Sequence, residues 1–80
     1  MQREIIVFGK SFIEFLGGLD KKTKEKVTYV IDILKFVDRI PEKFLEYIEG
    51  TDGLYEIRIS SGSNIYRVFC CFDKGNIVIL

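Results

Sequence analysis

Residues 53–72 read GLYEIRISSGSNIYRVFCCF, and this stretch decides the fold. On each side of a Ser-Gly-Ser-Asn turn, apolar residues recur at alternate positions, a pattern typical of half-buried β-strands. A glycine followed by any residue in a two-residue loop suits a type II′ turn. The sequence therefore predicts a β-hairpin whose loop is Gly62 and Ser63.

Counting back from this loop gives the register of the hairpin and places Arg58 opposite Arg67. Because successive side chains of a strand point to opposite faces, the two faces can be separated. One face is apolar: Tyr55, Ile57, Ile59, Tyr66, Val68 and Cys70. The other face carries Glu56, Arg58, Ile65, Arg67, Phe69 and Cys71. We expect the first face to be covered by helices and the second to be an outer face.

The rest of the chain predicts an α+β domain that begins with a strand at Arg3–Phe8. Two helices should follow as a hairpin. The first is predicted to be capped by Ser11 and to end at Gly17 and Gly18, and Asp20 is predicted to cap the second. Apolar residues of the second helix follow the spacing of a buried stripe: Val27, Val30, Ile31, Leu34 and Val37, widened by Tyr29, Ile33 and Phe36.

Pro41 favours the start of a further short helix, because proline suits the first turn, and Gly50 suits the C-terminal cap of that helix. Three strands are then predicted to form an antiparallel meander: roughly Leu54–Ser60, Asn64–Asp73 and Asn76–Leu80. A second turn at residues 74–75 places Val78 and Leu80 on the same face as the two arginines.

Composition limits the classes of function. The 80 residues include 12 basic and 12 acidic ones, so the net charge gives no sign of nucleic-acid binding. The absence of histidine removes the usual general base and the commonest metal ligand. Cys70 and Cys71 point to opposite faces of one strand, so we expect free thiols and no metal site. No apolar run is long enough to span a bilayer, and no signal-peptide pattern is present, so we expect a cytoplasmic protein without membrane contact.

The arginine pair needs a counter-charge, because two like charges directly opposite in a sheet are destabilising. One interpretation is an ordinary ion pair on a solvent face, since Glu56 lies beside Arg58 and diagonal to Arg67. The other is a phosphate, whose oxygens fit guanidinium donors. The same face also carries apolar residues: Ile65, Phe69, Val78 and Leu80. Monomers seldom expose such a patch, so we expect further chain or a partner to cover it.

Residues 53–72, followed by GNIVIL at 75–80, resemble the core of the HigB-like, phage-derived branch of the RelE/ParE toxin superfamily. The preceding FLGGLDKKTKEKVTYVIDIL, residues 15–34, is similar to the helical hairpin of that branch. The resemblance implies a small α+β toxin of a type II toxin–antitoxin pair that cleaves messenger RNA on the ribosome without a metal or other cofactor. The implied partners are the ribosome, messenger RNA and a cognate antitoxin, expected to be of the helix-turn-helix type.

The resemblance also assigns roles to the two arginines. Arg58 falls on the arginine of the family's leucine–arginine strand, and Arg67 falls on that of its YRV strand. Both are therefore predicted to be catalytic, binding the scissile phosphate and stabilising its developing charge while the 2′-hydroxyl of the RNA attacks. Tyr66 is a weak candidate for proton transfer because it faces the helices, and no other general base or acid is identified.

Members of this branch usually continue past the last strand into a basic segment, whereas this chain ends at Leu80. We therefore expect residues 1–80 to be one C-terminally incomplete toxin domain. The last strand, residues 76–80, is expected to be an edge that self-associates or needs the antitoxin to cover it. The alternative function is a non-catalytic binding protein, either a ParE-like inhibitor of a protein target or an inactive toxin that binds antitoxin.

The only basic cluster is formed by Lys21, Lys22 and Lys24, with Lys26 one turn further on. Lysines at a helix N-terminus oppose the helix dipole, which favours a role in phosphate contact with RNA. The other interpretation is a solvated helix start that is balanced by Glu25. The sequence leaves both interpretations open.

Overall fold

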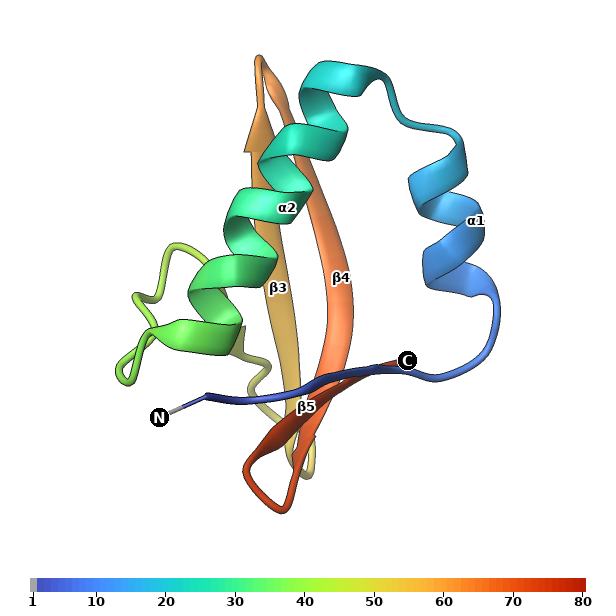
Figure 1. The fold of residues 1–80 in the computed structure, drawn as a ribbon. Coiled ribbons are helices and arrows are strands. Elements are labelled where there is room, and N and C mark those ends of the chain that lie inside the picture. Colours follow the sequence, from blue (N-terminus) through green and yellow to red (C-terminus); the bar gives the residue numbers. More distant parts are fainter. Residues whose placement is uncertain (1) are drawn as a thin grey trace.

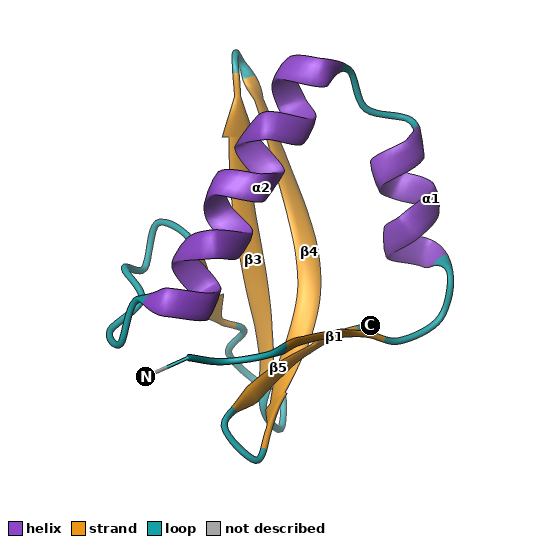
Figure 2. Ribbon diagram, in the orientation of Figure 1, coloured by secondary structure: helices purple, strands orange, loops and turns teal. Residues whose placement is uncertain are grey.

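The computed structural model describes residues 2–80, which form two helices and one five-stranded sheet (Figures 1 and 2). The elements in chain order are β1 (Ile5–Val7), α1 (Ser11–Gly17), α2 (Lys21–Phe36), β2 (Leu45–Tyr47), β3 (Leu54–Ser61), β4 (Asn64–Asp73) and β5 (Asn76–Ile79). The strand order is β1-β5-β4-β3-β2, with β1 parallel to β5 and the other neighbours antiparallel. The α+β class is confirmed, although the sheet is mixed and has two more strands than the predicted meander.

The predicted register of both hairpins is confirmed. Arg58 lies opposite Arg67, and Cys70 lies opposite Ile79. Gly62 has a φ of 63° and is followed by a residue without positive φ, as a type II′ turn requires. The other loop has positive φ at both central residues, 52° at Lys74 and 82° at Gly75, which is the type I′ pattern.

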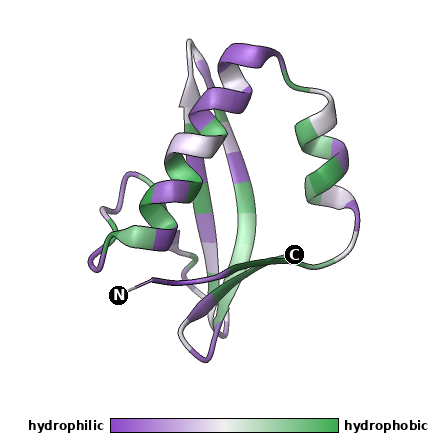
Figure 3. Ribbon diagram, in the orientation of Figure 1, coloured by the Kyte–Doolittle hydropathy of each residue, from purple (hydrophilic) through white to green (hydrophobic). Residues whose placement is uncertain are grey.

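The core lies between α2 and one face of the sheet, as predicted. Helix α2 runs across β3 and β4, and α1 stands beside β4 (Figure 1). The fully buried residues come from α2 and from alternate positions of the strands: Leu34, Ile57, Ile59, Cys70, Ile77 and Ile79. Hydrophobic residues also dominate β1 and β5 near the C-terminus (Figure 3). Burial on this face therefore fixes which side of every strand is left outside.

The helix caps agree with the sequence at one helix and differ at the other. The Asp20 carboxylate accepts a hydrogen bond of 2.8 Å from the Thr23 backbone N–H, as an N-cap does. The prediction of a Ser11 cap is wrong, because Ser11 is the first helical residue and Lys10 takes the cap position without a side-chain hydrogen bond. The buried stripe of α2 is narrower than predicted, since the predicted members Val37, Tyr29 and Phe36 are exposed.

The predicted short helix at Pro41–Gly50 is wrong. Only one turn forms, in which the backbone N–H groups of Phe44 and Leu45 donate to the Pro41 carbonyl. The chain then extends as β2, which pairs with residues 55–57 of β3. Ten residues with a helical pattern are too few to resist this pairing, because Leu45 becomes 8% exposed in the core when the segment is a strand.

The prediction that the last strand is a sheet edge is also wrong. Strand β5 lies between β4 and β1, and Ile5, Ile6 and Val7 pair with it. Arg3 anchors β1, because its guanidinium donates to the Leu34 and Val37 carbonyls at the end of α2, at 3.0 and 2.6 Å. The open edge lies elsewhere: β5 pairs only with residues 70–73 of β4, which leaves the first half of β4 without a strand on that side.

Neither helix in the part of the chain described, residues 2–80, is long and apolar enough to cross a membrane.

Candidate functional site

The candidate site is the outer face of the β3–β4 hairpin, where Arg58 and Arg67 lie side by side. Both strands place these residues opposite the helix-covered side. One oxygen of Glu56, Oε1, accepts from Nε of Arg58 at 2.8 Å and from Nε of Arg67 at 3.1 Å. Glu56 is therefore the shared counter-charge, as the ion-pair interpretation of the sequence predicted.

A second carboxylate, Glu46, was not expected from the sequence. Its Oε1 lies 2.7 Å from Nη2 of Arg58, so Arg58 bridges two glutamates that are opposite each other on β2 and β3. Sequence reasoning missed Glu46 because it placed this residue on a helix. The available signal was the apolar–acidic–apolar run of Leu45 to Tyr47, which is a strand pattern of only three residues.

The network shifts the pKa values of Glu56 and Arg58. The hydrogen bond from Arg58 lowers the pKa of Glu56, and the charges of both arginines add to that effect, while burial opposes it. The same hydrogen bond raises the pKa of Arg58. Glu56 is therefore an ionised counter-charge at neutral pH and holds the two guanidinium groups next to each other.

The two arginines differ in exposure and in the number of their carboxylate partners. The side chain of Arg58 is 33% exposed and has two carboxylate partners, whereas that of Arg67 is 53% exposed and has one. Within residues 2–80, the terminal Nη atoms of Arg67 have no hydrogen-bond acceptor. A free guanidinium edge of this kind is suited to the bidentate binding of a phosphate or carboxylate.

Apolar residues surround the arginine pair, as the register predicted. Ile65, Phe69 and Leu80 are 55%, 53% and 48% exposed on this side. A hollow of about 350 Å³ lies between α1 and the open edge of β4, and Phe12, Phe69 and Arg67 are among its lining residues. The face thus combines cations with an exposed hydrophobic surface, a combination that is typical of surfaces that bind other macromolecules.

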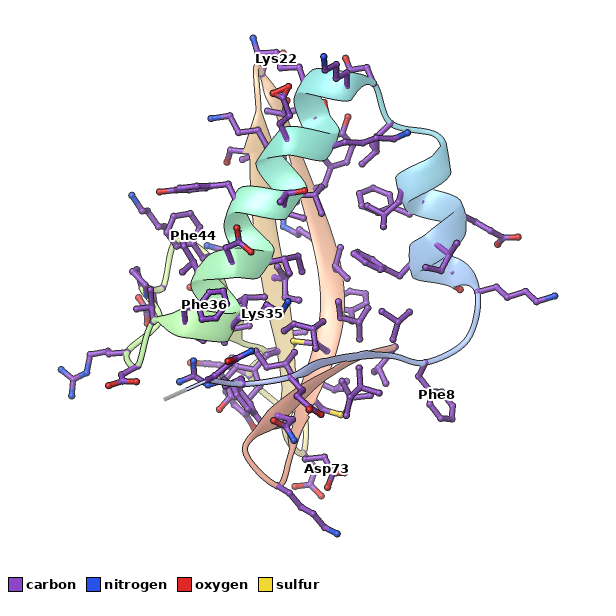
Figure 4. All side chains as sticks on the ribbon, in the orientation of Figure 1. Phe8, Lys22, Lys35, Phe36, Phe44 and Asp73 are labelled. Atoms are coloured by element: carbon purple, nitrogen blue, oxygen red, sulfur yellow. The ribbon has the colours of Figure 1, made fainter. Side chains whose placement is uncertain are left out.

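The predicted RNA-binding lysines lie away from the arginines. Lys21, Lys22 and Lys24 are exposed at the start of α2, where Lys22 points outward near the β3–β4 turn (Figure 4). A buried hydrogen bond of 3.0 Å between the Thr23 and Ser61 hydroxyls ties the helix start to the end of β3. The arginine pair is three residues further along the hairpin, roughly 10 Å, and on the other face of the sheet. The structure therefore does not bring the two groups together.

Tyr66 and the cysteines occupy the places that the register predicted. The Tyr66 ring packs against Phe15 of α1, with ring centroids 5.6 Å apart, so it faces away from the arginines. Cys70 is buried and Cys71 is partly exposed on the outer face, and both are free. Among the residues described, no group of three or more His, Cys, Asp and Glu side chains is placed to hold a metal ion.

The sequence places the chain in a family. Residues 14–80 match the family described as phage derived protein Gp49-like (DUF891), and the chain belongs to this family. The family is toxin-like, which agrees with the general resemblance of the sequence to toxins of toxin–antitoxin pairs. No match was found among curated proteins or among solved structures.

Proposed function

We propose that this protein is the toxin of a type II toxin–antitoxin pair and that it cleaves messenger RNA on the ribosome, in the cytoplasm, as HigB-like members of the RelE/ParE superfamily do. The observation that carries the proposal is the pair of adjacent guanidinium groups on an outer face, held by Glu56 at 2.8 and 3.1 Å. Membership of a toxin-like, phage-derived family supports it.

In the proposed reaction, Arg58 and Arg67 bind the two non-bridging oxygens of the scissile phosphate. The 2′-hydroxyl of the RNA loses its proton to water and bonds to phosphorus, which gives a 2′,3′-cyclic phosphate. The bond from phosphorus to the 5′-oxygen breaks, and that oxygen takes up a proton from water as it leaves. The negative charge on the phosphorane increases in the transition state, so two fixed cations stabilise the transition state more than the ground state. Arg67 binds the phosphate first, because its Nη atoms are free. Arg58 is held in position by its hydrogen bonds to Glu46 and Glu56.

The test is expression of the protein in a bacterial host, with growth and cleavage of ribosome-bound messenger RNA as readouts. We expect growth arrest and cleavage with the unmutated protein, and loss of both in Arg58→Ala and in Arg67→Ala. Arg39→Ala is the matched control, because Arg39 is an exposed arginine in the loop after α2 and should be dispensable. Circular dichroism of each variant separates loss of activity from loss of fold.

A second candidate function is protein binding without catalysis, either inhibition of a protein target or capture by an antitoxin. The exposed apolar side chains of Ile65, Phe69 and Leu80 next to the arginines favour this candidate. Full toxicity in the double Arg58→Ala, Arg67→Ala protein, with no cleavage of RNA, would replace the nuclease with this function. Co-purification with a neighbouring helix-turn-helix gene product would then identify the antitoxin.

A further inference from the structure

A small pocket lies at the edge of β3 beside the first residue of β2, next to the arginine site. The last strand contact there is the Arg58 backbone N–H, which donates to the Phe44 carbonyl at 2.9 Å. Beyond that point no strand of the described chain pairs with β3 on this side, and α2 contacts β3. The pocket encloses about 270 Å³, and its lining includes Arg58, Ser60, Lys26 and Lys43. It therefore shares Arg58 with the proposed active face.

The pocket is basic and aromatic, and none of the carboxylates among residues 2–80 lines it. Its basic lining residues are Lys26, Lys43 and Arg58, of which Arg58 is already paired with Glu46 and Glu56, so the two lysines carry its uncompensated charge. The neighbouring hollow beyond Arg58 is the reverse, since Glu42, Glu46, Glu49 and Glu56 line it. Acidic residues are thus gathered on one side of Arg58, and the pocket on its other side attracts anions.

The aromatic part of the pocket is accessible. Tyr29 is 57% exposed, and its ring meets the Phe44 ring at 73° with centroids 6.0 Å apart. Phe44 lies beside α2 (Figure 4), and the Lys43 ammonium is 5.0 Å from the centroid of its ring. Because Tyr29 is more than half exposed, its ring surface is available for stacking by a flat group.

We infer that this pocket binds one nucleotide of single-stranded RNA, with its base against Tyr29 and Phe44 and its phosphate between Lys26 and Lys43. Aromatic side chains beside cations are how proteins hold unpaired bases and the phosphates that link them. The volume of about 270 Å³ lies just under the roughly 300–1,000 Å³ of small-molecule sites, so the pocket holds no more than one nucleotide. The inference rests on the proposed function, because the RNA must run from this pocket to Arg58 and then to Arg67.

The test measures binding of a short single-stranded oligoribonucleotide, methylated at every 2′-oxygen to prevent cleavage, by fluorescence anisotropy at low salt. Tyr29→Ala should weaken binding roughly tenfold, and Tyr29→Phe should retain it because the ring remains. Replacing Lys26 and Lys43 together with glutamine should weaken binding and reduce its dependence on salt.

The matched control is Phe36→Ala. Phe36 is 56% exposed on the same helix and has the Lys35 ammonium 5.9 Å from its ring centroid. It is the last residue of α2 (Figure 4), about two turns from Tyr29. It does not line the pocket, so Phe36→Ala should bind RNA as the unmutated protein does. Equal losses in Tyr29→Ala and Phe36→Ala would overturn the inference.

Other outcomes separate this inference from the proposed function. Dependence of binding on Arg58 and Arg67 alone would overturn the pocket and leave the nuclease standing, and absence of RNA binding would overturn both. Displacement of RNA by polyglutamate with no dependence on Tyr29 would identify an acidic-peptide site instead. Photo-crosslinking of an oligonucleotide that contains 4-thiouridine needs no variant: the crosslink should map to the peptides that contain Tyr29 or Phe44, and a crosslink confined to β5 would contradict the assignment.

Discussion

The helix-facing side and the outer side of the sheet are built from alternate residues of the same strands, yet their side chains have opposite surroundings. On the helix-facing side, Ile57 is 1% exposed and Cys70 is fully buried. Their immediate neighbours on the outer side are Arg58, which takes part in the charged network, and Cys71, which is partly exposed. Folding energy is therefore concentrated on one face, and the other face is left free for chemistry and binding.

The strongest test of this difference compares Ile57 with its neighbour Arg58. Ile57→Ala removes buried methyl groups opposite Val68 and should lower the free energy of unfolding by about 2–5 kcal/mol. That loss is a large part of the stability of a small domain, about 5–15 kcal/mol. Arg58→Ala removes no buried side chain and should cost clearly less. Urea denaturation followed by circular dichroism measures both, and equal losses would show that the two faces are not divided as described.

The faces themselves could be predicted from the sequence because hairpin pairing is a local problem. Gly62 and Ser63 set the turn. Counting back from the turn then gives the strand partner of each residue in the hairpin, including Arg67 as the partner of Arg58. The pairing of β1 is long-range. Strand β1 joins β5 from more than seventy residues away in the chain, and nothing in its own residues specifies that neighbour.

Part of the candidate site was unpredictable for a different reason, which is that a local helical pattern competes with strand pairing. Glu46 reaches Arg58 only because residues 45–47 extend along β3, and a helical pattern around Pro41 competes with that pairing. The pocket with Tyr29 and Phe44 depends on where β2 begins. Local patterns identify strands and their faces. The edges at which sites form depend on which other segment of the chain pairs with each strand.

The adjacent cysteines sharpen the comparison within a single dipeptide. Burial raises the pKa of Cys70 to about 12, so its reactive thiolate is disfavoured in the folded protein. Iodoacetamide at pH 8 should therefore modify Cys71 first, and Cys70 more than about tenfold more slowly, only as the fold opens. Mass spectrometry of Cys70→Ser and Cys71→Ser proteins separates the two rates. Equal rates in native buffer would contradict the register of β4.

The smallest expected effect concerns the outer face alone and depends on pH. The folded-state pKa of Glu56 lies below its ordinary value, chiefly because Arg58 donates a hydrogen bond to the carboxylate. A carboxyl of this kind stabilises the fold above its unfolded-state pKa, about 4.3 for glutamate, and that contribution is lost as the pH falls through the folded-state pKa. The difference in unfolding free energy between the unmutated protein and Glu56→Gln should therefore be complete at pH 7 and shrink below about pH 4.3. High salt should shrink it at pH 7 as well, because the partner arginines are 33% and 53% exposed and are screened by ions. If the difference stays constant from neutral to acid pH, the arginines are held on the outer face by something other than Glu56, and the charged network does not position them.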